Sequence, residues 1–312
     1  MLPFSFLTPR PASRAQLEPD ADIPATLQGR YVIGAPANNP RKELTEEHPF
    51  PLVFIHGTTD NTFRWQKAAT YFAAQGYSVW AFNYGQPEEG RPAIPGVFAV
   101  NDINESALEI AATIDYILEV TGASKVDLVG HSQGGLHIKK YIAEHGGQDT
   151  VRRAVGVAAT YHGTTMTGMS SILQNLVDRN PEFADLVAGK AAIQQLSSSD
   201  FISRLNELPD THPNVMYTNI FTSKDLTATP NSTSQLESIG GADVAEAEVG
   251  EVCGLLLPPG HASLPENDHI IGLIEWGLTR EQGDHTPVHS GCNGGQRWKL
   301  GYRFFHESQN SR

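Results

Sequence analysis

The stretch VDLVGHSQGGLHIKKYI (Val126 to Ile142) places a serine between a buried-strand pattern and a helical pattern. Gly130, Ser132 and Gly134 form a G-x-S-x-G motif, which is followed by a second glycine, Gly135. A turn this tight forces the serine into a strained backbone conformation and requires neighbours without side chains. The helix that follows directs free N–H groups toward the serine, which favours negative charge there. We therefore interpret Ser132 as an exposed nucleophile at a strand-to-helix elbow.

A serine hydroxyl is a weak nucleophile until a base takes its proton. Where the nucleophile sits on such an elbow, the chain order is serine, then an acid, then a histidine. Asp225 stands just beyond the predicted strand NVMYTNIF (214–221), where a carboxylate can orient a histidine. Asp225 is therefore the predicted acid, and the alternative is an ordinary turn residue.

The histidines after Asp225 are His261, His269, His285, His289 and His306. His269 directly precedes the apolar helical run IIGLIEWGL (270–278), which would return it to the edge of the sheet. We predict His269 as the base, with His285 as the second choice and His261 as the third. The pair in HTPVH (285–289) lacks a third ligand nearby and is weak evidence for zinc, so no metal is predicted. No other cofactor motif is present.

The tetrahedral intermediate of acyl transfer needs hydrogen-bond donors for its oxyanion. One predicted donor is the backbone N–H of the residue after the nucleophile, Gln133. The second is the backbone N–H of Thr58 in HGTTD (56–60), where Gly57 lets the chain approach a ligand closely, and the Thr58 hydroxyl could add a further bond. The alternative for this segment is a turn with capping threonines.

Short apolar strands alternate with amphipathic helical patterns along the chain. The predicted strands are PLVFIHG (51–57), YSVWAFNYG (77–85), KVDLVG (125–130), AVGVAAT (154–160) and NVMYTNIF (214–221). This alternation predicts an α/β fold with a mostly parallel sheet and helices on both faces. We expect an irregular N-terminal arm (1–48), one domain (49–280) with a helical insertion at about 161–213, and a C-terminal extension (281–312).

The composition restricts the partners. The chain has 22 Lys and Arg residues against 35 Asp and Glu residues, a formal net charge of −13, which argues against nucleic acid and anionic membrane. No apolar run approaches the ~18 residues that a bilayer span requires, so no integral membrane segment is predicted. The first residues, MLPFSFLTPRPASRAQLEPD, are not a convincing signal peptide.

Together these motifs resemble the α/β-hydrolase superfamily and, within it, the class 2 bacterial lipases. The segments that carry the resemblance are VFIHGTTDN, VDLVGHSQGG, ATYHGTT, QQLSSSDFISRLN, TNIFTSKDLTATP and ENDHIIGL, over roughly residues 48–280. The resemblance implies an α/β-hydrolase fold and cleavage of carboxylic esters by Ser132, Asp225 and His269, with Thr58 and Gln133 as oxyanion donors. The expected substrates are acylglycerols or related lipid esters.

The resemblance also implies secretion, although no leader is visible, and the alternative is a cytoplasmic protein. An oxidising location would favour a disulfide between the two cysteines, Cys253 and Cys292, whose alternative is two buried thiols. Three other functions stay open: an acyltransferase with the same triad, an amidase, and an inactive hydrolase fold that only binds.

Overall fold

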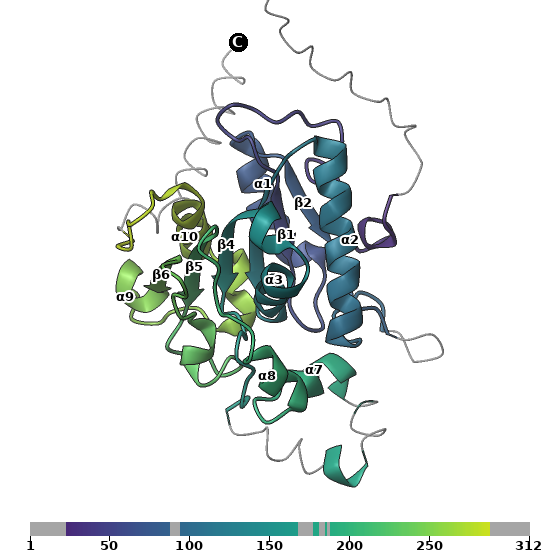
Figure 1. Ribbon diagram of the computed structural model, residues 1–312, viewed down its shortest axis with the longest axis vertical. Coiled ribbons are helices and arrows are strands. Elements are labelled where there is room, and N and C mark those ends of the chain that lie inside the picture. Colours follow the sequence, from purple (N-terminus) through teal and green to yellow (C-terminus); the bar gives the residue numbers. More distant parts are fainter. Residues whose placement is uncertain (1–22, 88–93, 168–176, 181–184, 186–187, 288–312) are drawn as a thin grey trace, which may run out of the picture.

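One six-stranded parallel sheet forms the centre of the molecule. The computed structural model describes residues 23–87, 94–167, 177–180, 185 and 188–287 (Figure 1). Every neighbouring pair in the sheet is parallel, in the order β2-β1-β3-β4-β5-β6. The strands are β1 (Leu52–Ile55), β2 (Val79–Phe82), β3 (Val126–His131), β4 (Val151–Val157), β5 (Met216–Phe221) and β6 (Asp243–Glu248). The predicted α/β class with a parallel sheet is confirmed.

The sixth strand was missing from the prediction. Its sequence, DVAEAE, alternates apolar and acidic residues from Ala245 to Glu248, where the alanines are buried and the glutamates are half-buried. β6 lies at the edge of the sheet and is buried on one face only, whereas the central strands β1 and β3 are buried throughout. Continuous apolar runs are typical of strands covered on both faces, so a search for such runs finds the central strands and passes over this one.

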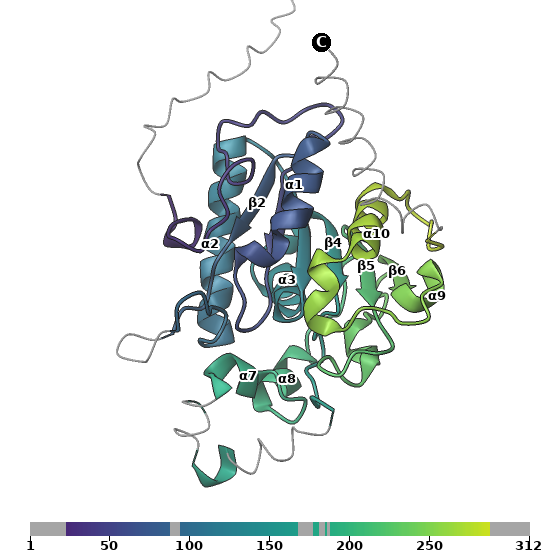
Figure 2. The same cartoon turned by 180° about the vertical axis from the view of Figure 1, so that it is seen from behind.

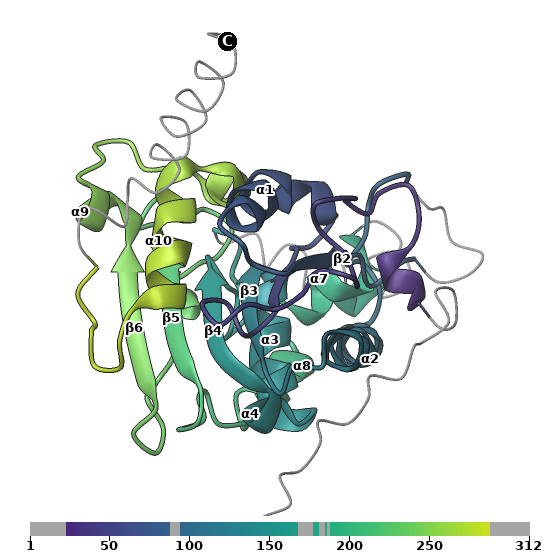
Figure 3. The ribbon, with the colours of Figure 1, turned by 90° about the horizontal axis from the view of Figure 1, so that it is seen from above.

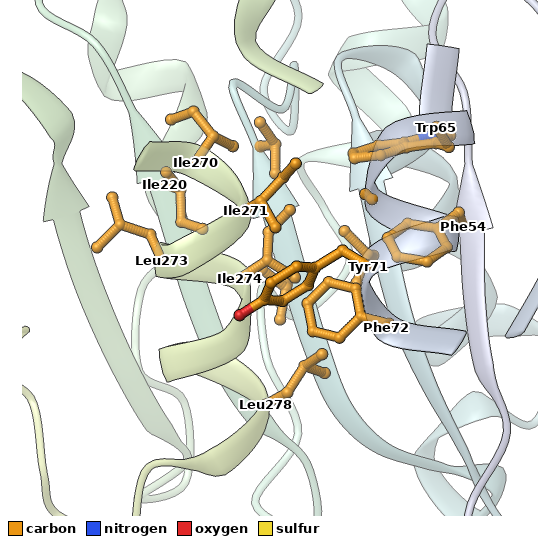
Figure 4. Close-up of a cluster of buried hydrophobic side chains, with 14 of the residues drawn as sticks. Phe54, Trp65, Tyr71, Phe72, Ile220, Ile270, Ile271, Leu273, Ile274 and Leu278 are labelled. Atoms are coloured by element: carbon orange, nitrogen blue, oxygen red, sulfur yellow. The ribbon is translucent and has the colours of Figure 1, made fainter. Parts of the chain in front are cut away.

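Helices cover both faces of the sheet, as predicted (Figures 2 and 3). Helices α1 (Gln66–Ala74) and α10 (Asp268–Thr279) pack on one face, where Phe54 and Ile220 of the sheet meet Phe72, Ile271 and Ile274 (Figure 4). Helices α2 (Ile103–Thr121) and α3 (Gln133–Glu144) pack on the opposite face. The remaining described elements are η1 (Ala25–Leu27), η2 (Thr62–Trp65), α4 (Gly147–Thr150), α7 (Lys190–Gln194), α8 (Asp200–Leu205), η3 (Asn231–Ser234), α9 (Val249–Cys253) and η4 (His261–Glu266).

The bounds of α2 follow from its sequence. The Asp102 carboxylate accepts hydrogen bonds from the backbone N–H groups of Asn104 and Glu105, which have no partner inside the first turn. The helix ends at Thr121 and is capped by Gly122, whose φ of 66° lies in the left-handed region that glycine adopts without strain. Between these ends, Ile110, Ile114 and Ile117 form a buried stripe against the sheet.

The described part of the predicted N-terminal arm, residues 23–48, runs along the outer edge of β2. The Asn38 backbone donates to the Val79 carbonyl, its side-chain oxygen accepts from the Ala81 N–H, and the Asn83 N–H donates to the Thr26 carbonyl. These bonds occupy polar groups at the edge of the sheet, where an unpaired strand would otherwise be open to another chain.

The predicted insertion (161–213) contains α7 and α8 among its described residues, and both lie beyond one end of the sheet (Figure 1). Residues 168–176, 181–184 and 186–187 of the insertion lie outside the described part, as do 1–22 and 288–312. No helix of the described residues is long and apolar enough to cross a membrane.

Candidate active site

Ser132 occupies the elbow between β3 and α3. Its backbone has φ 54° and ψ −121°, a strained conformation for a residue with a side chain, and its N–H donates to the Val157 carbonyl of the neighbouring strand β4. A Cβ built on Gly130 would lie 2.5 Å from the Gly134 carbonyl carbon, and a Cβ built on Gly134 would lie 2.3 Å from the Ile55 carbonyl oxygen. Glycine is therefore required on both sides of the serine.

Asp225 lies just beyond the carboxyl end of β5 and is 4% exposed. Its Oδ1 accepts hydrogen bonds from the backbone N–H groups of Thr227, at 2.7 Å, and Ala228, at 2.9 Å. Its Oδ2 lies 2.7 Å from Nδ1 of His261. The backbone donors fix the carboxylate, and the remaining oxygen orients the imidazole ring.

The histidine paired with Asp225 is His261, the third choice of the sequence analysis, and the ranking that put His269 first needs correction. His269 lies in the first turn of α10, where its backbone N–H donates to the Asn267 side chain. His269 was the predicted base because an apolar helix, now seen as α10, follows it. The histidine that contacts Asp225 is instead the first residue of η4, between α9 and α10.

His285, the second choice, lies elsewhere. Its Nε2 is 3.0 Å from Oδ1 of Asp243, the first residue of β6. In a parallel sheet this is the amino end of the strands, opposite the carboxyl ends of β3 and β5 that Ser132 and Asp225 follow. His285 is therefore at the wrong end of the sheet to serve the elbow.

His131, the residue before the serine, connects the elbow to His261. Its Nε2 lies 3.1 Å from the His261 carbonyl oxygen, and the two imidazole rings are 4.7 Å apart. Because a carbonyl only accepts, the His131 Nε2 carries the hydrogen. Burial, helped by the nearby His261, lowers the pKa of His131 well below its ordinary value, so the ring is neutral. The sequence analysis assigned no role to this residue.

The two predicted oxyanion donors lie next to Ser132. Gln133 begins α3, and a Cβ built on Gly57 would lie 3.0 Å from the Ser132 Cβ, which places the Gly57–Thr58 backbone against Ser132. Within the described part of the chain, the backbone N–H groups of Thr58 and Gln133 have no hydrogen-bond acceptor. Both remain available to a ligand.

The described residues contain no group of three or more His, Cys, Asp or Glu side chains that could hold a metal ion. His289, the other histidine of the HTPVH pair, lies outside them. Cys253 is buried at the end of α9, and Cys292 lies outside the described residues, so their pairing stays a prediction. Secretion also stays a prediction.

The sequence profile of the lipase (class 2) family matches residues 49–248. The chain belongs to the class 2 lipases. This match covers the elbow, Asp225 and the Gly57–Thr58 loop, and it ends at the last residue of β6, before His261. The predicted family is confirmed.

Solved structures support the fold of this class 2 lipase. Lipase B of Aspergillus fumigatus superimposes with a TM-score of 0.61 at 18% identity, over 83% of this chain and 59% of the fungal one. A structure from a study of LipS and LipT, two metagenome-derived lipolytic enzymes, gives a TM-score of 0.50 at 16% identity, over 71% of this chain and 88% of the other. The chain therefore spans about three fifths of the fungal lipase it matches.

Proposed function

We propose that this protein is a serine hydrolase that cleaves carboxylic esters of lipids, with Ser132 as nucleophile, His261 as base and Asp225 as acid. The observation that carries the proposal is the 2.7 Å contact between His261 Nδ1 and Asp225 Oδ2, together with the contact of His261 with His131, which directly precedes the serine of the elbow. Membership of the class 2 lipases supports carboxylic esters, and acylglycerols in particular, as substrates.

The proposed reaction proceeds through an acyl-enzyme. The Ser132 Oγ attacks the ester carbonyl carbon while His261 Nε2 takes the hydroxyl proton, and Asp225 stabilises the charged imidazole through Nδ1–H. The backbone N–H groups of Thr58 and Gln133 donate to the oxyanion of the tetrahedral intermediate. Collapse of the intermediate transfers the proton from His261 to the departing alcohol. Water then repeats the sequence, releasing the fatty acid and regenerating Ser132.

The experiment is a rate profile over p-nitrophenyl esters of increasing chain length, together with emulsified triacylglycerol. We expect hydrolysis of esters in the wild type and a loss of several orders of magnitude in kcat for Ser132→Ala. Ser124→Ala, an exposed serine before β3, is the matched control and should keep the wild-type rate. Hydrolysis by Ser132→Ala at the wild-type rate would overturn the assignment of the nucleophile.

Three measurements separate the other functions. An added alcohol that diverts most of the acyl group from water would indicate an acyltransferase. Faster cleavage of amides than of matched esters would indicate an amidase. A fluorophosphonate probe that leaves Ser132 unlabelled would indicate a protein that only binds.

A further inference from the structure

The Thr58 hydroxyl accepts hydrogen bonds from two carboxamides. Gln133 Nε2 lies 3.2 Å from Thr58 Oγ1, and Gln195 Nε2 lies 2.9 Å from the same atom. Gln133 belongs to the nucleophile helix α3, whereas Gln195 directly follows α7 in the insertion between β4 and β5. Two segments that are distant in the sequence thus meet at one hydroxyl group of the candidate oxyanion hole.

Backbone carbonyls fix which end of each carboxamide faces Thr58. Gln133 Nε2 also donates to the Ala99 carbonyl at 3.3 Å, and Gln195 Nε2 to the Ala191 carbonyl at 3.2 Å. A carbonyl oxygen only accepts, so each carboxamide must direct its nitrogen, not its oxygen, to this side. Each NH₂ group then donates one hydrogen to a carbonyl and its other hydrogen to Thr58.

This arrangement determines what the Thr58 hydroxyl can do. A hydroxyl oxygen has two lone pairs and one hydrogen. The carboxamides occupy both lone pairs, so the hydroxyl is left with its hydrogen, for which no acceptor lies within hydrogen-bonding distance in the described part of the chain. The Gly57–Thr58 backbone lies against Ser132, so this hydrogen is available to an oxygen bound there.

We propose that Gln195 is a positioning residue of the oxyanion hole, which holds the Thr58 hydroxyl as an obligatory donor toward the substrate oxyanion. The inference rests on the proposed function. The two amide donors also polarise the O–H bond, because hydrogen bonds in a chain strengthen one another. The oxyanion carries full charge only near the transition state, so the effect appears in kcat more than in KM.

The structure holds Gln195 rigidly enough for this role. The side chain is buried, and its Oε1 accepts from the Thr160 hydroxyl at 2.9 Å. The preceding helix α7 is bound to the start of α2, since Gln194 Oε1 accepts from the Ile103 N–H at 2.8 Å and Lys190 pairs with Asp102 at 3.2 Å. The insertion is therefore part of the site itself.

A double-mutant cycle tests the proposal in the full chain. Thr58→Val removes the hydroxyl, and Gln195→Glu replaces the donating nitrogen with a carboxylate oxygen that would accept the Thr58 hydrogen. We expect each single variant to lose roughly 10²-fold in kcat, as for loss of one oxyanion donor, with little change in KM. In the Thr58→Val background, Gln195→Glu should cause no further loss. Thr58→Ser, which keeps the hydroxyl, should keep most of the wild-type kcat.

Two further variants separate positioning from loosening of the insertion. Gln195→Met buries no charge and provides a second double-mutant cycle if Gln195→Glu fails to fold. It should reduce kcat by a smaller factor than Gln195→Glu, and this reduction should also be absent in the Thr58→Val background. Gln194→Met removes the hydrogen bonds of the Gln194 side chain to Ile103 and Asp102 but does not touch Thr58. It should lower the midpoint of thermal unfolding and reduce kcat by much less than Gln195→Met, because the bonds of the Gln195 side chain to Thr58 and Thr160 remain.

The proposal is wrong if Gln195→Glu and Gln195→Met reduce kcat by the same factor in the wild-type and Thr58→Val backgrounds, or if they raise KM alone. These results leave the proposed function intact, provided that Ser132→Ala is inactive. Failure of the proposed function is recognised separately, by an active Ser132→Ala variant.

Discussion

Glu246 is a half-buried residue of β6 whose charge should make the stability of the protein depend on pH. It lies on β6, where its Oε1 accepts from Asn219 Nδ2 at 2.8 Å, and Asn219 Oδ1 in turn accepts from the Tyr161 hydroxyl at 3.0 Å. Its Oε2 is shielded from solvent. Burial raises the pKa of Glu246 from 4.5 to about 7, although hydrogen bonding to Asn219 and to the Leu236 backbone opposes the shift.

The difference between the pKa of Glu246 in the folded and unfolded protein determines how stability changes with pH. Above pH 4.5 the unfolded chain releases the proton, while the folded protein retains it up to about pH 7. The free energy of unfolding therefore falls as the pH rises through this window, by about 3 kcal/mol in total. Glu246→Gln keeps a carbonyl oxygen for Asn219 and has no proton to lose, so it should gain about 3 kcal/mol over the wild type between pH 4.5 and pH 8.

Urea unfolding followed by tryptophan fluorescence at several pH values measures this gain. Glu119→Gln on α2, an exposed glutamate, is the control, and its difference from the wild type should stay within about 0.5 kcal/mol at every pH. If the difference between Glu246→Gln and the wild type is the same at pH 4.5 and pH 8, Glu246 is charged in the folded protein and the reasoning fails.

Two single substitutions test the elbow and a buried ion pair by urea unfolding. Gly134→Ala would place a Cβ 2.3 Å from a backbone carbonyl oxygen of β1, so we expect the free energy of unfolding to fall by about 3 kcal/mol. Gly260→Ala, which has open space around the new Cβ, is the control and should not change it. Equal effects of the two substitutions would contradict the account of the elbow. In the wild type the fully buried ammonium group of Lys139 lies 2.6 Å from the Asp210 carboxylate. Asp210→Asn removes this counter-charge and should lower the free energy of unfolding by about 3–5 kcal/mol. A loss below 1 kcal/mol would show that water reaches Lys139.

The local pattern of the chain was enough to predict the central sheet and the strand-to-helix elbow at Ser132. The strands β1 and β3 are buried on both faces, and β1 (LVFI) is continuously apolar while β3 (VDLVGH) is mostly so. The steric demands at Ser132 leave glycine as the only residue that fits at positions 130 and 134. Such features depend on residues within a few positions of one another. β6 was missed because this edge strand lacks a continuous apolar run and carries acidic residues between its apolar ones.

The partners of the nucleophile could not be ranked in the same way. His261 lies 36 residues after Asp225, and the path of the intervening chain through β6 and α9 decides where it arrives. The role of Gln195 depends on the docking of α7 against the start of α2, a contact between segments about ninety residues apart in the sequence. Neither position carries a local pattern that separates it from other histidines or glutamines.

The identity of the catalytic base is tested most directly by comparing two alanine variants. We would measure kcat/KM for p-nitrophenyl butyrate with His261→Ala and His269→Ala, after confirming by thermal unfolding that both fold. The structure predicts that His261→Ala loses several orders of magnitude, while His269→Ala stays close to the wild type. Loss of activity in His269→Ala together with an active His261→Ala would contradict the proposed triad.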